Sequence, residues 1–152
     1  MEVCQDYEDL FRILNAHGIR YLVAGAQAVI YYTEPRYTKD LDVWVIPEMN
    51  DPRNVMRALA NFGAPLKGLS KDDFDNGQLI IQIGVAPVRV DILLDIEGVD
   101  FKKAWKNRKR ARYGNVPINV MGIADLIKAK KAAGRPQDIV DLEKLIKVKK
   151  KQ

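Results

Sequence analysis

Two aspartates stand two positions apart in an otherwise apolar, β-like segment, Asp40-Leu41-Asp42-Val43. Because side chains alternate between the two faces of a strand, Asp40 and Asp42 share one face while Leu41 and Val43 point to the other. Carboxylates held this close repel each other, and a hard divalent cation such as Mg²⁺ or Mn²⁺ relieves the repulsion. The pair therefore indicates a metal site. Taken alone, however, such a pair is more often the solvent face of an edge strand.

A third carboxylate can lie beside the pair. Residues 88–96 (VRVDILLDI) form a strongly β-like run in which Asp91 falls among apolar residues. The nearest apolar neighbours of Asp91 point to the opposite face of the predicted strand. Asp91 can therefore join Asp40 and Asp42, and this context favours the metal site over the edge strand.

A turn of small residues precedes the aspartate pair. Residues 21–24 read as an apolar strand, Gly25-Ala26 as a turn and residues 27–32 as a short helix. The lack of bulk at Gly25 and Ala26 lets backbone N–H groups and the helix N-terminus approach a phosphate. Two residues of the following polar loop are expected to help at the mouth of the site: Arg36 and Thr38.

These motifs resemble the nucleotidyltransferase superfamily that includes DNA polymerase β. Within it they are similar to small bacterial proteins related to AbiE-type toxins and to minimal nucleotidyltransferases of toxin-antitoxin systems. The family pattern is a hydrophobic residue, Gly and Gly or Ser, then a spacer, Asp-hydrophobic-Asp-hydrophobic, and a later Asp on a strand. This chain supplies residues 23–26, 40–43 and 90–92. It departs at Ala26, which lacks the serine hydroxyl but keeps a backbone N–H.

The resemblance implies an α/β (α+β) fold, with a mixed β-sheet flanked by helices and a C-terminal helical hairpin. It also implies Mg²⁺- or Mn²⁺-dependent transfer of a nucleoside monophosphate from a nucleoside triphosphate (NTP) to a hydroxyl acceptor. Asp40, Asp42 and Asp91 would be the metal ligands and catalytic residues. Asp91 would share the ion nearer the acceptor and either lower the pKa of the acceptor hydroxyl or act as its base. Gly25 and Ala26 would hold the β- and γ-phosphates.

Residues 126–145 match the helical hairpin of many relatives. Two predicted helices are separated there by Gly134-Arg135-Pro136. By the resemblance, Lys128 or Lys131 of the first helix would neutralise triphosphate charge. Arg135 and Asp138 would either lie near the nucleotide or serve only as a turn and a helix cap.

The length of 152 residues suits one domain, with its core at about residues 7–120 and the hairpin at about 122–148. A composition of 47% hydrophobic and 30% charged residues is typical of a soluble globular protein. No apolar run is long enough for a membrane span, and the acidic N-terminus is unlike a signal peptide. We expect a cytoplasmic protein without a membrane partner.

Other segments predict the elements around the site. Residues 7–14 show helical spacing of apolar side chains, and a further helix should begin near Pro52 and end at Gly63. Residues 64–77 read as an irregular exposed loop. Strands are expected at residues 79–85, 88–94 and 116–120, with Ala86-Pro87 between the first two.

The basic segment at residues 101–113 leaves a second reading open. It interleaves lysines and arginines with Trp105 and Tyr113, which suits contact with nucleic acid as well as a solvated helix and strand edge. A non-catalytic module that binds nucleotide or RNA is therefore the alternative to an active enzyme, and Ala26 favours it. A toxin-antitoxin role is compatible with the enzyme. The acceptor can be RNA, a partner protein or a small molecule such as an aminoglycoside.

Overall fold

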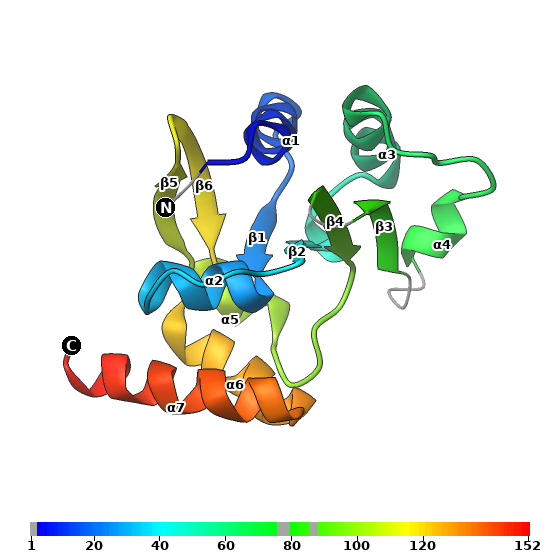
Figure 1. Ribbon diagram of the computed structural model, residues 1–152. Helices are drawn as coiled ribbons and strands as arrows, with labels where there is room; N and C mark the ends of the chain where they lie inside the picture. Colours follow the sequence, from blue (N-terminus) through cyan, green and yellow to red (C-terminus); the bar gives the residue numbers. More distant parts are fainter. Residues whose placement is uncertain (1–2, 76–79, 86–87) are drawn as a thin grey trace.

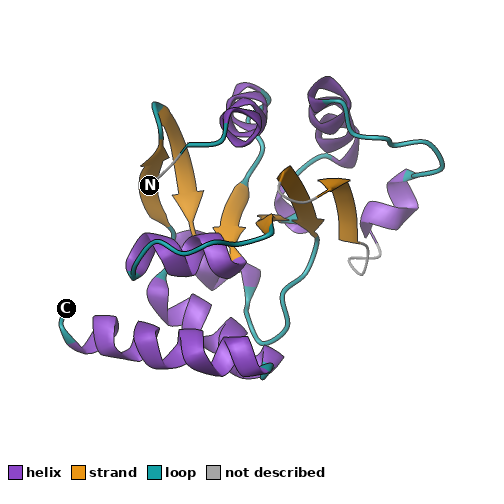
Figure 2. Ribbon diagram, in the orientation of Figure 1, coloured by secondary structure: helices purple, strands orange, loops and turns teal. Residues whose placement is uncertain are grey.

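A computed structural model describes residues 3–75, 80–85 and 88–152 of the chain. Strands and helices are interspersed along it (Figures 1 and 2). In chain order the elements are α1 (Gln5–Ala16), β1 (Tyr21–Ala24), α2 (Gly25–Tyr32), β2 (Asp40–Val45), the 3-10 turn η1 (Pro47–Met49), α3 (Pro52–Phe62), α4 (Lys71–Asp75), β3 (Ile80–Val85), β4 (Val88–Leu93), α5 (Phe101–Lys106), β5 (Lys109–Tyr113), β6 (Val116–Val120), α6 (Ile123–Ala133) and α7 (Pro136–Lys150).

The described strands form one six-stranded sheet in the order β3-β4-β2-β1-β6-β5. The sheet is mixed, because β1 pairs parallel to β6 and β2 parallel to β4, whereas the other neighbours are antiparallel. Helices α1 and α3 pack together, and α2, α6 and α7 form a second group that includes the C-terminal helical pair (Figure 1). The predicted mixed sheet flanked by helices, with its C-terminal helical pair, is confirmed.

The apolar face of each central element fills the core. The largest fully buried side chains are Trp44 and Tyr21 in the central strands and Phe11 in α1. Phe11 stacks on Tyr21, with ring centroids 5.9 Å apart. This packing holds β1 and β2 in the middle of the sheet, where the end of β1 lies beside the aspartates at the start of β2.

The helix predicted from Pro52 to Gly63 is confirmed as α3. The side chain of Asp51 accepts a hydrogen bond from the backbone N–H of Arg53, and Pro52 occupies the first turn. Gly63 ends the helix in the left-handed conformation, with φ of 96°. None of the described helices is long and apolar enough to span a membrane.

The prediction of an irregular loop over residues 64–77 is wrong in part, because the short helix α4 lies within it. Phe74 is buried at 2% exposure, and the backbone N–H of Ser70 donates to the Asp73 carboxylate at 2.8 Å. Burial of one aromatic residue and this local turn are enough to order the helix. Residues 76 and 77 of that loop, Leu79 of the predicted strand and Ala86-Pro87 lie outside the described residues.

Candidate active site

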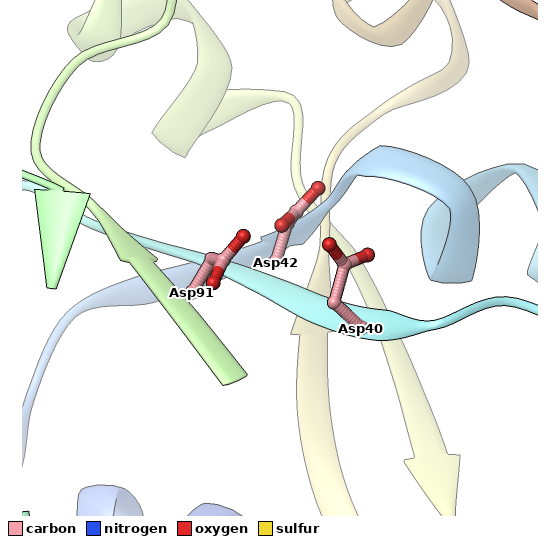
Figure 3. A group of neighbouring side chains, drawn as sticks. All are labelled: Asp40, Asp42 and Asp91. Atoms are coloured by element: carbon pink, nitrogen blue, oxygen red, sulfur yellow. The ribbon is translucent and has the colours of Figure 1, made fainter. Parts of the chain in front are cut away.

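The register of two neighbouring strands brings the three aspartates together. Parallel pairing of β2 with β4 places Asp42 directly opposite Asp91 and Asp40 opposite Arg89. Ligand oxygens of Asp40, Asp42 and Asp91 all lie within 4.8 Å of one another. Figure 3 shows the three carboxylates on the same side of the two strands, pointing into one space. The predicted convergence of these three side chains is therefore observed.

Electrostatic repulsion within this triad is only partly compensated. Burial and the charges of Asp40 and Asp91 raise the pKa of Asp42 from its ordinary 3.8 to about 7. Burial and the neighbouring Asp91 also raise the pKa of Asp40. The Arg89 guanidinium holds Asp91 through two hydrogen bonds of 2.9 and 3.0 Å. A site with excess negative charge and hard oxygen donors favours a divalent cation.

This repulsion should make the stability of the metal-free protein depend on pH. A folded-state pKa above the unfolded value means that the folded state binds more protons between pH 4 and 7, so stability falls as pH rises through this window. Asp42→Asn removes the ionising group. In EDTA, we expect the free energy of unfolding of the variant, relative to that of the wild type, to increase by about 1 kcal/mol as the pH rises from 5 to 8. This change corresponds to roughly 2–4 °C in Tm.

Thermal unfolding of both proteins across this pH range measures the difference. Mg²⁺ or Mn²⁺ should raise the Tm of the wild type and have a smaller effect on Asp42→Asn, because ligand binding stabilises the folded state. A Tm difference between the two proteins that stays constant from pH 5 to 8 would contradict the assigned repulsion.

The turn from β1 into α2 lies against the triad. Ala24 pairs with Asp42 in the sheet, and Gly25 then opens α2 with φ of +58°. A β-carbon on Gly25 would overlap the Asp42 carboxylate, whose Cγ lies 2.9 Å from that position. Ala24, the N-cap residue, offers no side-chain hydrogen bond, so the first N–H groups of α2 are available to a ligand. These N–H groups and the Asp42 carboxylate border the same space.

Gly25→Ala should therefore disturb the site in two ways: by backbone strain and by contact of the new β-carbon with Asp42. Gly18 is a matched control, since its φ is +65° but nothing lies within 4 Å of an added β-carbon. Both alanine variants adopt a left-handed backbone at a cost of roughly 1–2 kcal/mol. We expect Gly25→Ala to lower the nucleotidyl transfer expected from the sequence about 100-fold, by displacing Asp42. Gly18→Ala should keep nearly the wild-type rate. Equal activities in steady-state assays would show that the contact of Gly25 with Asp42 has no functional weight.

A cavity of about 480 Å³ opens beside the triad. Its lining joins the α2 turn to the aspartates, the loop before β2 and the start of the helical hairpin: Gly25, Ala26, Arg36, Tyr37, Thr38, Lys39, Asp40, Asp42, Lys130, Arg135, Pro136, Gln137, Asp138 and Asp141. The predicted phosphate turn and the predicted loop residues Arg36 and Thr38 therefore line the same cavity as the first two aspartates. Its volume is within the usual range for small-molecule sites.

A network of charges forms the hairpin side of this cavity. Lys130 Nζ lies 3.0 Å from Asp138 Oδ1 and 3.2 Å from Asp141 Oδ2. Arg36 also binds Asp141, at 3.1 Å, and Arg135 binds Asp138, at 2.8 Å. Three cations thus share two carboxylates, which leaves the network positive. Burial opposes ionisation of Asp138, but hydrogen bonds from Arg135 and Lys130 outweigh it and lower its pKa.

The structure places Lys130 at the cavity, rather than Lys128 or Lys131, which sequence analysis had singled out. Lys128 and Lys131 are exposed and line neither the cavity nor the charge network. Successive residues of a helix turn by about 100°, so neighbours of Lys130 point elsewhere. Lys130 follows the buried Leu126 and Ile127 by four and three residues, and this lysine at an apolar position was the available signal.

Two carboxylates of α7 line the cavity, Asp138 and Asp141. Asp138 accepts a hydrogen bond from the backbone N–H of Arg135 at 3.1 Å, so it caps the helix and also lines the cavity. Asp141 is fully buried, and sequence analysis assigned it no functional role.

The basic residues of the segment 101–113 do not line the cavity at the aspartates. Within this segment, the guanidinium of Arg108 lies over the Trp105 ring, 4.0 Å from its centroid.

Comparison with known proteins agrees with this geometry. Residues 3–152 match the model of a family described as nucleotidyl transferase of unknown function (DUF2204). The chain belongs to this nucleotidyl transferase family. The match extends over the sheet, the three aspartates and the helical hairpin. A search of curated proteins found no matching sequence.

Solved structures share the fold of this family member. One is the lincosamide antibiotic adenylyltransferase LnuA with lincomycin bound, at a TM-score of 0.62 and 12% identity, covering 97% of this chain and 99% of that one. A proposed nucleotidyltransferase from Thermotoga maritima has a TM-score of 0.60 and 16% identity, covering 93% and 90%. An antigenic nucleotidyltransferase-like protein from Paracoccidioides brasiliensis has a TM-score of 0.59 and 15% identity, covering 96% and 78%. At these identities the likeness establishes the nucleotidyltransferase fold.

Proposed function

We propose that this protein transfers a nucleoside monophosphate from an NTP to a hydroxyl acceptor. The observation that carries the proposal is the convergence of Asp40, Asp42 and Asp91, with ligand oxygens within 4.8 Å of one another. They stand beside a cavity that also contains an open helix N-terminus and a positive charge network. Phosphoryl transfer requires this combination of positioning and charge neutralisation more than it requires covalent help.

The three carboxylates fit Mg²⁺ or Mn²⁺, because they offer only hard oxygen donors and two of them have raised pKa values. A divalent ion bound there would stabilise negative charge at the α-phosphate and lower the pKa of the acceptor hydroxyl. Asp40, Asp42 and Asp91 would hold the metal, with Asp91 on the side of the acceptor.

The other residues of the cavity have distinct tasks. Backbone N–H groups at Gly25 and Ala26 bind the β- and γ-phosphates, and this contact needs no side chain at either position. The network around Lys130 attracts the triphosphate, with the exposed arm of Arg135 beside it. Arg89 orients Asp91, which receives the proton of the acceptor hydroxyl. Ala26 is therefore compatible with catalysis.

Pyrophosphate release tests the proposal at its simplest. Each of the four NTPs is incubated with purified protein, Mg²⁺ or Mn²⁺ and a cell extract that supplies acceptors, and Asp40→Asn is run in parallel. Pyrophosphate that depends on Asp40 and on the extract supports nucleotidyl transfer. Metal-dependent nucleotide binding without pyrophosphate would favour the non-catalytic binding module.

A toxin-antitoxin role is a finer part of the same proposal, and it rests on the resemblance of the motifs. It predicts that expression of the wild type arrests growth and that Asp40→Asn relieves the arrest. Growth arrest of equal strength with both proteins would separate toxicity from the proposed chemistry.

A further inference from the structure

A second cavity, of about 640 Å³, adjoins the nucleotide cavity. The two share one wall, which consists of Arg36, Tyr37 and Thr38 from the loop before β2. Asp40 lines the nucleotide cavity, and its backbone carbonyl oxygen accepts a hydrogen bond at 3.3 Å from the hydroxyl of Thr38, a residue of the shared wall. A molecule in the second cavity can therefore present a group to a nucleotide bound in the first.

The far wall of this second cavity is fixed to the strands that carry the triad. The Tyr7 hydroxyl donates to the backbone carbonyl of Arg89 at 3.2 Å, and Arg89 is the residue opposite Asp40 in the sheet. Tyr113 packs 6.3 Å from Tyr7, ring centroid to ring centroid, and its hydroxyl accepts from the backbone N–H of Cys4 at 2.7 Å. These two buried tyrosines, held by backbone groups, make this wall firm.

The chemistry of the lining differs from that of the nucleotide cavity. Apolar side chains such as Ile30 and Val88 alternate with neutral polar ones such as Gln27. Arg36 is the single charged side chain among the described residues that line it, and its guanidinium forms an ion pair with Asp141, a carboxylate that Lys130 shares. Among the described residues of this lining there is no carboxylate to hold a polycation. These residues also lack the row of cations that the phosphates of a polynucleotide need.

We propose that the second cavity binds the acceptor, and that the acceptor is an uncharged, partly apolar small molecule with a hydroxyl group. The inference rests on the proposed nucleotidyl transfer and adds the class of acceptor. Cavities of this size suit drug-sized ligands, and such sites are mostly apolar with a few placed polar groups. Tyr37, which is 71% exposed and lines both cavities, offers a ring on which an aromatic acceptor can stack.

The reaction balances with the NTP as the second substrate. The acceptor oxygen forms a bond to the α-phosphorus, and the bond from the α-phosphorus to the oxygen bridging to the β-phosphate breaks. Pyrophosphate leaves with that electron pair, and the proton of the acceptor hydroxyl passes to Asp91. The product is a phosphodiester between the acceptor and the nucleoside.

Filling the cavity tests its assignment without touching the nucleotide side. Gln27, in the first turn of α2, lines only the second of these two cavities, so Gln27→Trp should block it and leave the backbone N–H groups in place. Tyr31→Trp is the matched control, since Tyr31 belongs to the same helix, is 38% exposed and lines neither cavity. The probe is the neutral aromatic dye N-phenyl-1-naphthylamine, followed by its fluorescence. We expect Gln27→Trp to weaken dye binding at least ~10-fold and Tyr31→Trp to leave it unchanged.

A labelled-acceptor panel then identifies the class. Wild type and both tryptophan variants are offered α-³²P NTP with neutral aromatic alcohols, aminoglycosides and an RNA oligonucleotide. The proposal expects label on neutral alcohols, at least ~10-fold less of it with Gln27→Trp, and an unchanged KM for the NTP. Label on aminoglycoside or RNA that Gln27→Trp does not reduce would overturn it, as would dye binding that is absent or insensitive to Gln27→Trp. Dye binding with the expected pattern but no label on any acceptor would leave the cavity assigned and count against the proposed transfer itself.

Discussion

Asp40→Asn and Asp91→Asn are each expected to lower nucleotidyl transfer by at least ~10³-fold and to leave the fold intact. Both substitutions keep the shape of the side chain but remove one charge from a set of carboxylates whose ligand oxygens lie within 4.8 Å of one another. Loss of several kcal/mol of transition-state stabilisation corresponds to this factor in rate. Steady-state turnover and circular dichroism measure the two parts of the prediction.

Asp95→Asn is the matched control for these variants. Asp95 follows β4 and is exposed, and it does not belong to the converging group. Its replacement should leave turnover within a factor of two of the wild type. If Asp40→Asn retained more than a tenth of wild-type turnover with native stability, the triad would not be the catalytic centre.

Lys130→Ala should have the second largest effect, on stability as well as on nucleotide affinity. The Lys130 side chain is 9% exposed and contacts the buried carboxylates of Asp138 and Asp141. Removing one partner from a buried ion pair typically costs about 3–5 kcal/mol. Arg36 and Arg135 still bind these two carboxylates, so we expect the lower end, about 3 kcal/mol, and a Tm lower by roughly 6–12 °C. The KM for the NTP should rise because the cavity loses positive charge.

Lys131→Ala separates this effect from a general loss of charge on α6. Lys131 is the next residue along the helix and is exposed, so its replacement should change stability by less than about 0.5 kcal/mol. Thermal unfolding of both variants at one pH gives the comparison. Equal Tm values for the two would contradict the buried network, and a lower Tm for Lys131→Ala would reverse the assignment of the lysine.

Local patterns predicted the parts of this molecule that depend on local physics. The alternation of side chains predicted that Asp40 and Asp42 share one face of β2 and that Asp91 lies on the face of β4 opposite its apolar neighbours. The parallel pairing of the two strands, which the structure shows, places Asp42 opposite Asp91. Capping rules likewise gave the start and end of α3. In contrast, α4 was not predicted, because Phe74 is the only apolar residue of this five-residue helix and gives no periodic pattern. The spacing of Ser70 and Asp73, which is that of a capping box, was the available signal.

Long-range pairs account for most of what sequence analysis missed. Arg36 and Asp141 are 105 residues apart and meet only because α7 packs beside α2. The second cavity likewise draws its walls from α1, the loop before β2 and β5. No spacing within any one segment indicates such contacts. Lys130 is different, because its spacing from Leu126 and Ile127 indicates a position on the buried face of α6. The resemblance instead pointed to its exposed neighbours Lys128 and Lys131.

The fate of the α-phosphate tests the central claim most directly. Purified protein, Mg²⁺ or Mn²⁺ and the small-molecule fraction of a cell extract are incubated in parallel with α-³²P and γ-³²P NTP, with Asp40→Asn as the control. Our account predicts that α-label joins a new product and γ-label appears only in pyrophosphate, and that both events disappear in Asp40→Asn. Transfer of γ-label to the product, or release of all α-label as free nucleoside monophosphate, would contradict nucleotidyl transfer.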